Sequence, residues 1–264
     1  MKRVLGTIIL IIAIICFGWS AFSLGKYAWQ TWTTQKNLDN LADKVNNDTI
    51  SIPDTDKESE ESEDPVSESE AMMEKYGELY KENKDFIGWL SVEGTKINYP
   101  VMYTPNDPEY YLRKNFDGDY DIGGMLFVDA RCTFNPTSTD TIIYGHHMNN
   151  GTMFGPLMDF QDNDYLKKHT TITFDTMYRP GTYKIFASFQ SKAYDPDSEE
   201  FKYYDFINAE TSYDFEEYLN NIKNLSLYYD EENAPSFGDE IITLSTCDYY
   251  TTDGRFAVLA KRIK

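Results

Sequence analysis

Short apolar stretches with strand-like composition recur through most of the chain, and turn residues separate them. Motifs such as Arg179-Pro180-Gly181 mark the turns. The predicted strands span residues 96–102, 123–130, 140–146, 170–175, 182–190, 240–247 and 255–263. Many short strands with few helices are typical of a mainly β fold, a β-barrel or sandwich with helical insertions.

Two other segments follow a helical period. The first predicts a short amphipathic helix that docks on the core, and its apolar positions are Met72, Met73, Tyr76, Leu79 and Tyr80. The second lies in the long connection before residues 240–247. Thr211 or Ser212 can cap this helix, and its apolar face comprises Phe215, Tyr218, Leu219 and Ile222.

The N-terminal segment is apolar in a different way. Residues 4–24 carry no charge and, as a helix, extend about 30 Å, enough to cross a hydrocarbon core. A cleavable signal peptide is the alternative, but Ser20-Ala21-Phe22 matches its cleavage site poorly. We therefore expect an uncleaved, single-pass signal-anchor at residues 4–25. The basic residues of segment 1–3 favour a cytoplasmic N-terminus and an extracellular remainder.

An acidic stretch follows this anchor. Residues 46–70 hold a dense negative run with almost no large apolar side chains, so they cannot bury enough surface to fold. We expect residues 26–70 to be an extended linker and residues 71–264 to be one folded domain. A chain of 264 residues has room for one sizeable core beside such segments.

Composition narrows the possible functions. The 21 Tyr and 16 Phe can build a packed core, and the net charge of -20 argues against nucleic acid as a partner. The chain has only three cysteines, Cys16, Cys132 and Cys247. A small and odd number of cysteines does not indicate a disulfide framework.

The candidate chemistry begins with Cys247, which ends a predicted strand. A polar loop follows, and Arg255 opens the next strand. Antiparallel pairing of these strands sets the two side chains side by side. A guanidinium favours a nearby thiolate and can donate hydrogen bonds to an oxyanion. A structural alternative remains at this point, in which Cys247 fills a strand end and Arg255 is a surface cation.

A nucleophilic cysteine needs a proton partner, and His146 is the best placed of three histidines. It lies at the end of predicted strand 140–146, beside a loop. His147 would point to the opposite side if that strand continued, and His169 is most simply a surface residue. No cluster of metal-ligand spacing accompanies them, so we expect neither a metal nor a cofactor.

These motifs resemble the sortase family. The TLSTC of residues 243–247, followed by Arg255, resembles the family's T-L-x-T-C…R signature, and Tyr144-Gly145-His146 resembles its G-H motif. Segments similar to class B sortases are residues 85–90, 97–101, 110–112, 123–127 and 151–154, together with the helix near 212–224. The resemblance covers residues 72–264.

The resemblance implies an eight-stranded sortase barrel and a cysteine transpeptidase, a peptidase-type hydrolase or acyltransferase. Cys247 would attack the Thr carbonyl of a C-terminal sorting signal and form a thioacyl intermediate. His146 would protonate the leaving amine and then deprotonate the incoming one, and Arg255 would hold the substrate carbonyl or the oxyanion. A thioester conserves the energy of the cleaved bond for amide formation.

Weaker assignments follow from the same motifs. Tyr144, Ser245 and Thr246 are substrate-contact candidates, although strand packing explains them as well. Asp248 is interpreted as a loop acid, and Cys132 as inert.

The implied partners are surface proteins that bear a sorting signal and a cell-wall amine, on a peptidoglycan precursor or cross-bridge, of Gram-positive bacteria. The membrane is contacted through residues 4–25. A sortase-type pilin polymerase and a hydrolytic cysteine peptidase would use the same residues. A non-enzymatic, membrane-tethered binding or scaffold domain is the alternative from another class.

Overall fold

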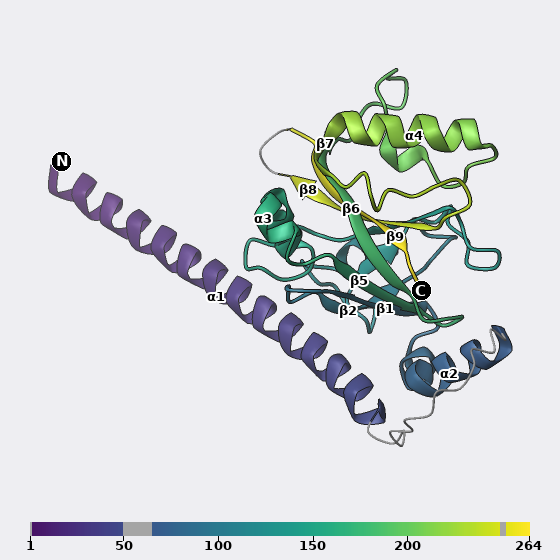
Figure 1. Cartoon of the computed structure of the whole chain (residues 1–264). Coiled ribbons are helices and arrows are strands. Elements are labelled where there is room, and N and C mark those ends of the chain that lie inside the picture. The colour runs from purple at the N-terminus through teal and green to yellow at the C-terminus, as the bar shows by residue number, and fades with distance from the viewer. Residues whose placement is uncertain (1, 50–64, 249–251) are drawn as a thin grey trace. The chain divides into compact units, whose positions relative to one another are not determined.

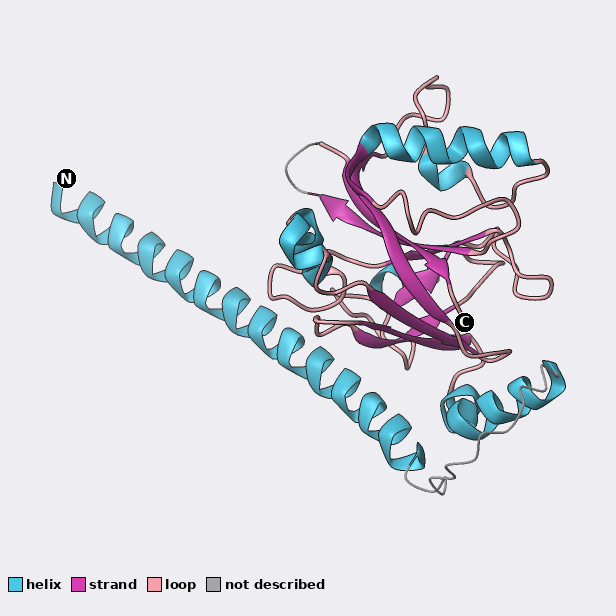
Figure 2. Cartoon of the chain, viewed as in Figure 1, coloured by secondary structure: helices cyan, strands magenta, loops and turns pink. Residues whose placement is uncertain are grey.

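The computed structural model describes residues 2–49, 65–248 and 252–264. The chain divides into two compact units, Met1–Asn40 and Leu41–Lys264, which are described separately. Figure 1 labels the main elements and Figure 2 distinguishes helices from strands. The helices are α1 (Lys2–Thr49), α2 (Pro65–Glu82), α3 (Asn163–Leu166) and α4 (Ser212–Leu225), with 3-10 turns η1 (Tyr110–Arg113), η2 (Gly155–Gln161) and η3 (Tyr203–Asp205). The strands are β1 (Phe86–Val92), β2 (Asn98–Met102), β3 (Leu126–Val128), β4 (Asp140–Tyr144), β5 (Thr171–Thr176), β6 (Thr182–Lys192), β7 (Ser226–Tyr229), β8 (Ile241–Asp248) and β9 (Gly254–Arg262).

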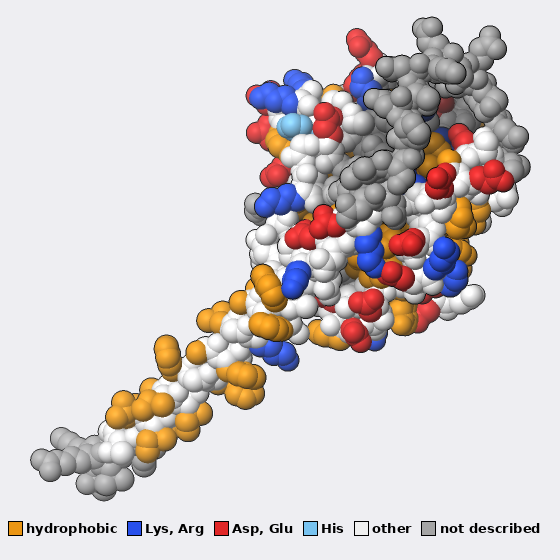
Figure 3. All heavy atoms as spheres, turned by 90° about the horizontal axis from the view of Figure 1, so that it is seen from below, with side chains coloured by type: hydrophobic (Ala, Val, Ile, Leu, Met, Phe, Trp, Pro, Cys, Tyr) orange, Lys and Arg blue, Asp and Glu red, His pale blue; other side chains and the backbone are white. Residues whose placement is uncertain are grey.

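Helix α1 carries the apolar N-terminal segment. Its stretch Ile9–Val45 is long and apolar enough to cross a membrane by length and composition. Hydrophobic side chains line the helix in Figure 3, whereas charges of both signs are scattered over the visible face of the second unit. Residues 26–49 contain neither Gly nor Pro, and they are helical where composition led us to expect an extended linker. Residues 50–64 lie outside the described residues.

The second unit is a closed β-barrel, which confirms the predicted fold. The strands follow the order β5-β1-β2-β3-β4-β8-β9-β6, and β5 pairs with β6 to close the ring of eight described strands. Strand β7 adds to β6 outside this ring. Neither β1 nor β7 was among the seven predicted strands. β1 is buried along almost its whole length and lacks alternation, and β7 follows α4 without a turn residue.

Helix α2 docks on the barrel as predicted, except that Met73 of the predicted apolar face is exposed. Tyr76 and Leu79 are buried, and the Tyr76 ring is stacked on Trp89 of β1. The Tyr76 hydroxyl donates to Asp175 of β5 at 2.9 Å, and Lys75 forms a salt bridge to the same carboxylate. The helix is therefore held by apolar packing and by a satisfied polar pair.

Helix α4 covers another face of the barrel (Figure 1). It begins with a capping box in which Thr211 and Asp214 satisfy each other's backbone N–H groups, so Thr211 is the cap. Phe215, Tyr218 and Ile222 are buried against the aromatic side chains of β6 and the connection that follows it. Strands β8 and β9 are buried along most of their length, the polar Thr243, Ser245 and Thr246 of β8 included.

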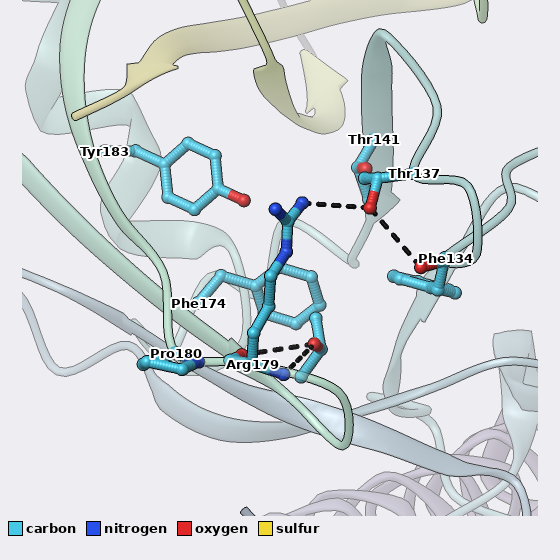
Figure 4. Close-up of a pocket in the computed structure, with 8 residues that line it drawn as sticks. Phe134, Thr137, Thr141, Phe174, Arg179, Pro180 and Tyr183 are labelled. Carbon is cyan, nitrogen blue, oxygen red and sulfur yellow. Dashed lines mark hydrogen bonds between the residues drawn. The ribbon is translucent and has the colours of Figure 1, made fainter. Parts of the chain in front are cut away.

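A small polar pocket lies near the start of β4 and β8. Figure 4 shows the Arg179 guanidinium between the Tyr183 ring and Thr137. It donates to the Thr137 hydroxyl at 2.9 Å and forms a salt bridge with Glu240. Arg179 therefore joins the β5–β6 turn to the loops that precede β4 and β8.

Candidate active site

The candidate site lies where two central strands end together. Strand β4 pairs with β8 in parallel, and Tyr144 is the register partner of Ser245. His146 and Cys247 each lie two residues further along these neighbouring chains. Residues separated by 101 positions in sequence are therefore brought to one end of the barrel by strand register alone.

Cys247 and Arg255 face each other across the β8–β9 pair, as the sequence predicts. Directly opposed residues in antiparallel strands project to the same face with Cβ atoms about 5 Å apart. Both side chains are partly exposed. Arg255 Nη1 donates to the Gly254 carbonyl at 2.9 Å, which anchors the guanidinium at the edge of the site.

The residue before His146 must be glycine for packing reasons. A Cβ on Gly145 would lie 2.5 Å from a Leu126 methyl and 2.6 Å from the Phe154 ring. Without a side chain, the backbone turns out of β4 against these groups. The G-H motif therefore has a steric basis in this fold.

His146 is half-buried and has a defined hydrogen-bond partner. Its Nε2 lies 2.8 Å from the Leu112 carbonyl oxygen, and since a carbonyl only accepts, Nε2 carries the proton. Burial lowers the pKa of His146 below its ordinary value, assisted by the nearby charge of Arg113 and opposed by the Leu112 hydrogen bond. The ring is therefore held neutral at neutral pH, with its lone pair on Nδ1.

Tyr144 contributes to a charged network on the wall of the site. Its hydroxyl donates to Asp129 at 3.0 Å, and Arg131 donates to both carboxylate oxygens of Asp129. Burial acts to raise the pKa of Asp129, but hydrogen bonds from Arg131 and Tyr144 outweigh it and hold the pKa below its usual range. Arg131 also donates to the Tyr204 carbonyl, so the network ties β3 and β4 to the connection before α4.

Ser245 and Thr246 are buried beneath the site and already have partners. The Ser245 hydroxyl lies 2.7 Å from the hydroxyl of the fully buried Tyr203. Thr246 Oγ1 donates to the Gly145 carbonyl at 2.8 Å and so fastens β8 to the end of β4.

All six candidate residues line one pocket. Its wall also includes residues that sequence reasoning did not single out, among them Asp129, Arg131, Tyr203 and Tyr204. The two charged residues Asp129 and Arg131 follow an apolar run, and this pattern could have indicated them as pocket residues. The lining is Pro108, Glu109, Leu112, Phe127, Asp129, Ala130, Arg131, Tyr144, Gly145, His146, Ala193, Tyr194, Tyr203, Tyr204, Ser245, Thr246, Cys247 and Arg255.

The remaining reactive side chains have different settings. Cys132 is buried, and burial raises the pKa of its thiol to about 12, which suits an inert residue. The His169 ring packs against Tyr165. The side chain of Asp248 lies outside the described residues. Within the part of the chain that the structure describes, no three His, Cys, Asp or Glu side chains gather as metal ligands would.

His147 was expected to point to the opposite side of the sheet from His146 if the strand continued, and the structure differs from this expectation. Strand β4 ends at Tyr144, so the alternation assumed for a continued strand does not apply. The His147 Nδ1 instead lies 3.1 Å from the backbone carbonyl oxygen of Cys247.

Comparisons with known proteins identify the family and the fold. The sortase domain family matches residues 90–263. The chain is 37% identical over 171 residues to sortase B of Listeria monocytogenes, covering 65% of this chain and 66% of that protein. It is 32% identical over 197 residues to sortase B of Staphylococcus aureus, covering 74% and 77%. The structure of a Staphylococcus aureus sortase B-substrate complex superimposes with a TM-score of 0.69 at 27% identity, covering 89% of this chain and 98% of that one.

Proposed function

Because the chain belongs to the sortase family of cysteine transpeptidases and its relatives are class B members, we propose that it transfers proteins bearing a sorting signal to a cell-wall amine. Cys247, His146 and Arg255 would perform the reaction in the pocket at the end of β4 and β8. The observation that carries the proposal is their convergence: a thiol, an imidazole and a guanidinium from three strand termini line one pocket. Sortase B of Staphylococcus aureus has been solved as a substrate complex, which supports a substrate-binding role for the corresponding fold here.

In the first half-reaction, the Cys247 sulfur attacks the carbonyl carbon of the signal's Thr. The C–S bond forms as the thiol proton passes to His146, and the peptide C–N bond breaks as His146 gives that proton to the leaving amine. Arg255 faces Cys247 across the strand pair, where its guanidinium can donate to the developing oxyanion. The product is a thioester between Cys247 and the surface protein.

His146 would transfer the protons. Its Nε2–H is held by the Leu112 carbonyl, so Nδ1 is the nitrogen that exchanges a proton with the reacting groups. In the second half-reaction an amine attacks the thioester and gives up its proton, and the Cys247 sulfur leaves. An amide bond is restored without ATP.

The cellular setting follows from α1. We place residues 4–25 in the membrane as a single-pass anchor, with residues 1–3 in the cytoplasm and the barrel outside, at the cell wall. The length and apolar composition of α1 support the membrane span, and the basic Lys2 and Arg3 support the cytoplasmic side for the N-terminus. The barrel would then meet its two substrates, exported surface proteins and wall precursors, on the same side of the membrane.

The direct test is intact-mass spectrometry of the detergent-solubilised full chain. It is incubated with a small library of peptides carrying Asn-Pro-x-Thr-like and Pro-x-Thr-like signals. We expect an acyl adduct that peptide mapping assigns to Cys247, and its absence in Cys247→Ala. Adding triglycine as an acceptor amine should discharge the adduct to a ligated peptide.

Other outcomes separate the alternatives. Discharge only to the free acid in the presence of amine would indicate a hydrolytic peptidase. If no peptide acylates Cys247 and Cys247→Ala changes nothing, the enzymatic proposal is wrong and a scaffold role is favoured.

A further inference from the structure

A series of single hydrogen bonds continues the β4–β8 contact beyond the end of β4. The Gly145 N–H donates to the Ser245 carbonyl at 3.2 Å, and Thr246 Oγ1 donates to the Gly145 carbonyl at 2.8 Å. The last contact is between His147 Nδ1 and the Cys247 carbonyl oxygen, at 3.1 Å. The side chain of His147 therefore replaces a backbone ladder bond at the point where the nucleophile lies.

The chemistry of this contact fixes the histidine's protonation. A carbonyl oxygen accepts and never donates, so the proton must lie on Nδ1. The ring is half-buried. Both the neutral Nδ1–H tautomer and the imidazolium carry a proton on Nδ1, so either form can donate this hydrogen bond to the Cys247 carbonyl.

The backbone around His147 is fixed independently. His147 forms an isolated β-bridge with Met153, and the Phe154 N–H donates to the His146 carbonyl at 3.0 Å. Met153 and Phe154 are completely buried. The imidazole of His147 therefore extends from a rigid turn.

The acceptor of this hydrogen bond, the Cys247 carbonyl oxygen, belongs to the nucleophile itself. The carbonyl carbon and the Cβ of Cys247 are bonded to the same Cα, so a hydrogen bond that holds this carbonyl restricts backbone motion at the residue that carries the thiol. Because His147 adjoins His146, one hydrogen bond ties the segment of the base to the backbone of the nucleophile. Misplacement of reacting groups by about 1 Å can cost about a hundredfold in rate.

We propose that His147 is a positioning residue, which holds the Cys247 carbonyl through Nδ1–H and so fixes the placement of the Cys247 thiol relative to the His146 imidazole. It acts on the reaction through Cys247 and does not itself exchange protons with substrate. The proposal rests on the proposed transpeptidase function, but its physical core is testable without any substrate.

The variants follow from the atom used. In His147→Asn the side-chain amide nitrogen is attached at the same carbon as Nδ1 and can donate to the same carbonyl. In His147→Gln it is one bond further out, and in His147→Ala it is absent. His169→Ala is the matched control, because it removes an imidazole from a residue outside the site pocket.

The first readout is peptide transfer by the full chain in detergent. We expect His147→Ala to lower kcat about tenfold to a hundredfold with KM nearly unchanged. His147→Asn should restore most of the loss, His147→Gln less, and His169→Ala should match the wild type. The shape of the kcat–pH profile should be the same in His147→Asn and the wild type.

The second readout is the rate at which iodoacetamide alkylates Cys247, followed by peptide mass mapping. This rate should fall in His147→Ala and recover in His147→Asn, and it remains measurable if the chain transfers no peptide. A wild-type alkylation rate and kcat in His147→Ala would overturn the proposal. So would failure of His147→Asn together with loss of one limb of its pH profile, since that pattern indicates a proton-transfer role.

Discussion

The buried carboxyl of Asp140 predicts a specific dependence of stability on pH. Asp140 opens β4 and is completely buried. One carboxyl oxygen accepts hydrogen bonds from Thr243 at 2.7 Å and Tyr218 at 3.2 Å. The other has no hydrogen-bond partner among the described residues.

Burial raises the pKa of Asp140 to about 7, although the hydrogen bonds from Thr243 and Tyr218 oppose the rise. The folded state therefore retains this proton at pH values where the unfolded chain, with an ordinary value of 3.8, has lost it. The stabilising effect is complete below pH 4 and is lost as the pH rises from 4 through 7. A shift of this size corresponds to about 4 kcal/mol.

The test compares wild type with Asp140→Asn, which is neutral at every pH. The free energy of unfolding is measured by urea titration of tryptophan fluorescence between pH 4 and pH 8. Groups common to both proteins cancel in the difference. We expect the stability of the variant relative to wild type to increase with pH, by on the order of 4 kcal/mol across this range.

Asp129→Asn is the control of opposite sign. The pKa of Asp129 is lowered, so its contribution to stability is present at neutral pH and is lost as the pH falls through the folded value. The deficit of this variant should therefore shrink in acid. A flat difference between Asp140→Asn and wild type from pH 4 to pH 8 would refute the reasoning, because it would mean that Asp140 titrates alike in both states.

Three further predictions concern the site and its support. Gly145→Ala should cost about 1–3 kcal/mol in the free energy of unfolding and reduce peptide transfer, because its Cβ meets Leu126 and Phe154; thermal melting and a transfer assay check this. In a histidine NMR titration, the pKa of His146 should lie below its ordinary value of 6.5. The contribution of His146 to stability is then present above pH 6.5 and is lost as the pH falls through the folded-state pKa. An imidazole signal that titrates above pH 6.5 would contradict this prediction. Arg179→Ala should lower the free energy of unfolding by about 1–2 kcal/mol, yet leave the Cys247 alkylation rate unchanged. The variant loses the hydrogen bond to Thr137, which Figure 4 shows, and the partly exposed salt bridge to Glu240.

Local sequence patterns predict most strands of the barrel. The seven predicted strands are all present, because each alternates or clusters β-branched and aromatic residues between clear turn signals. The boundaries erred where tertiary contacts decide them. Residues 123–125 are excluded from β3 because Gly124 adopts a positive φ of 57°. A Cβ at this position would lie 2.5 Å from the carbonyl oxygens of Tyr111 and Leu112.

Local sequence patterns likewise predict one part of the site and not the other. The pairing of Cys247 with Arg255 follows from two adjacent strands and a loop, so local reasoning suffices. Nothing local indicates that β4 and β8, separated by nearly a hundred residues, run parallel as neighbours. That pairing is what brings His146 to Cys247, and only the motif resemblance supplied it in advance.

His147 shows most clearly where sequence reasoning stops. The period-two rule placed it away from the site, on the condition that the strand continued. The strand ends at Tyr144, and at the next residue, Gly145, a Cβ would collide with Leu126 and Phe154, a contact between elements that no local pattern records. Once the chain leaves the sheet, the direction of a side chain is set by the turn, and this turn directs the His147 imidazole to the Cys247 carbonyl. The turn that follows Tyr144 thus carries both histidines, His146 into the pocket lining and His147 to the backbone of the nucleophile.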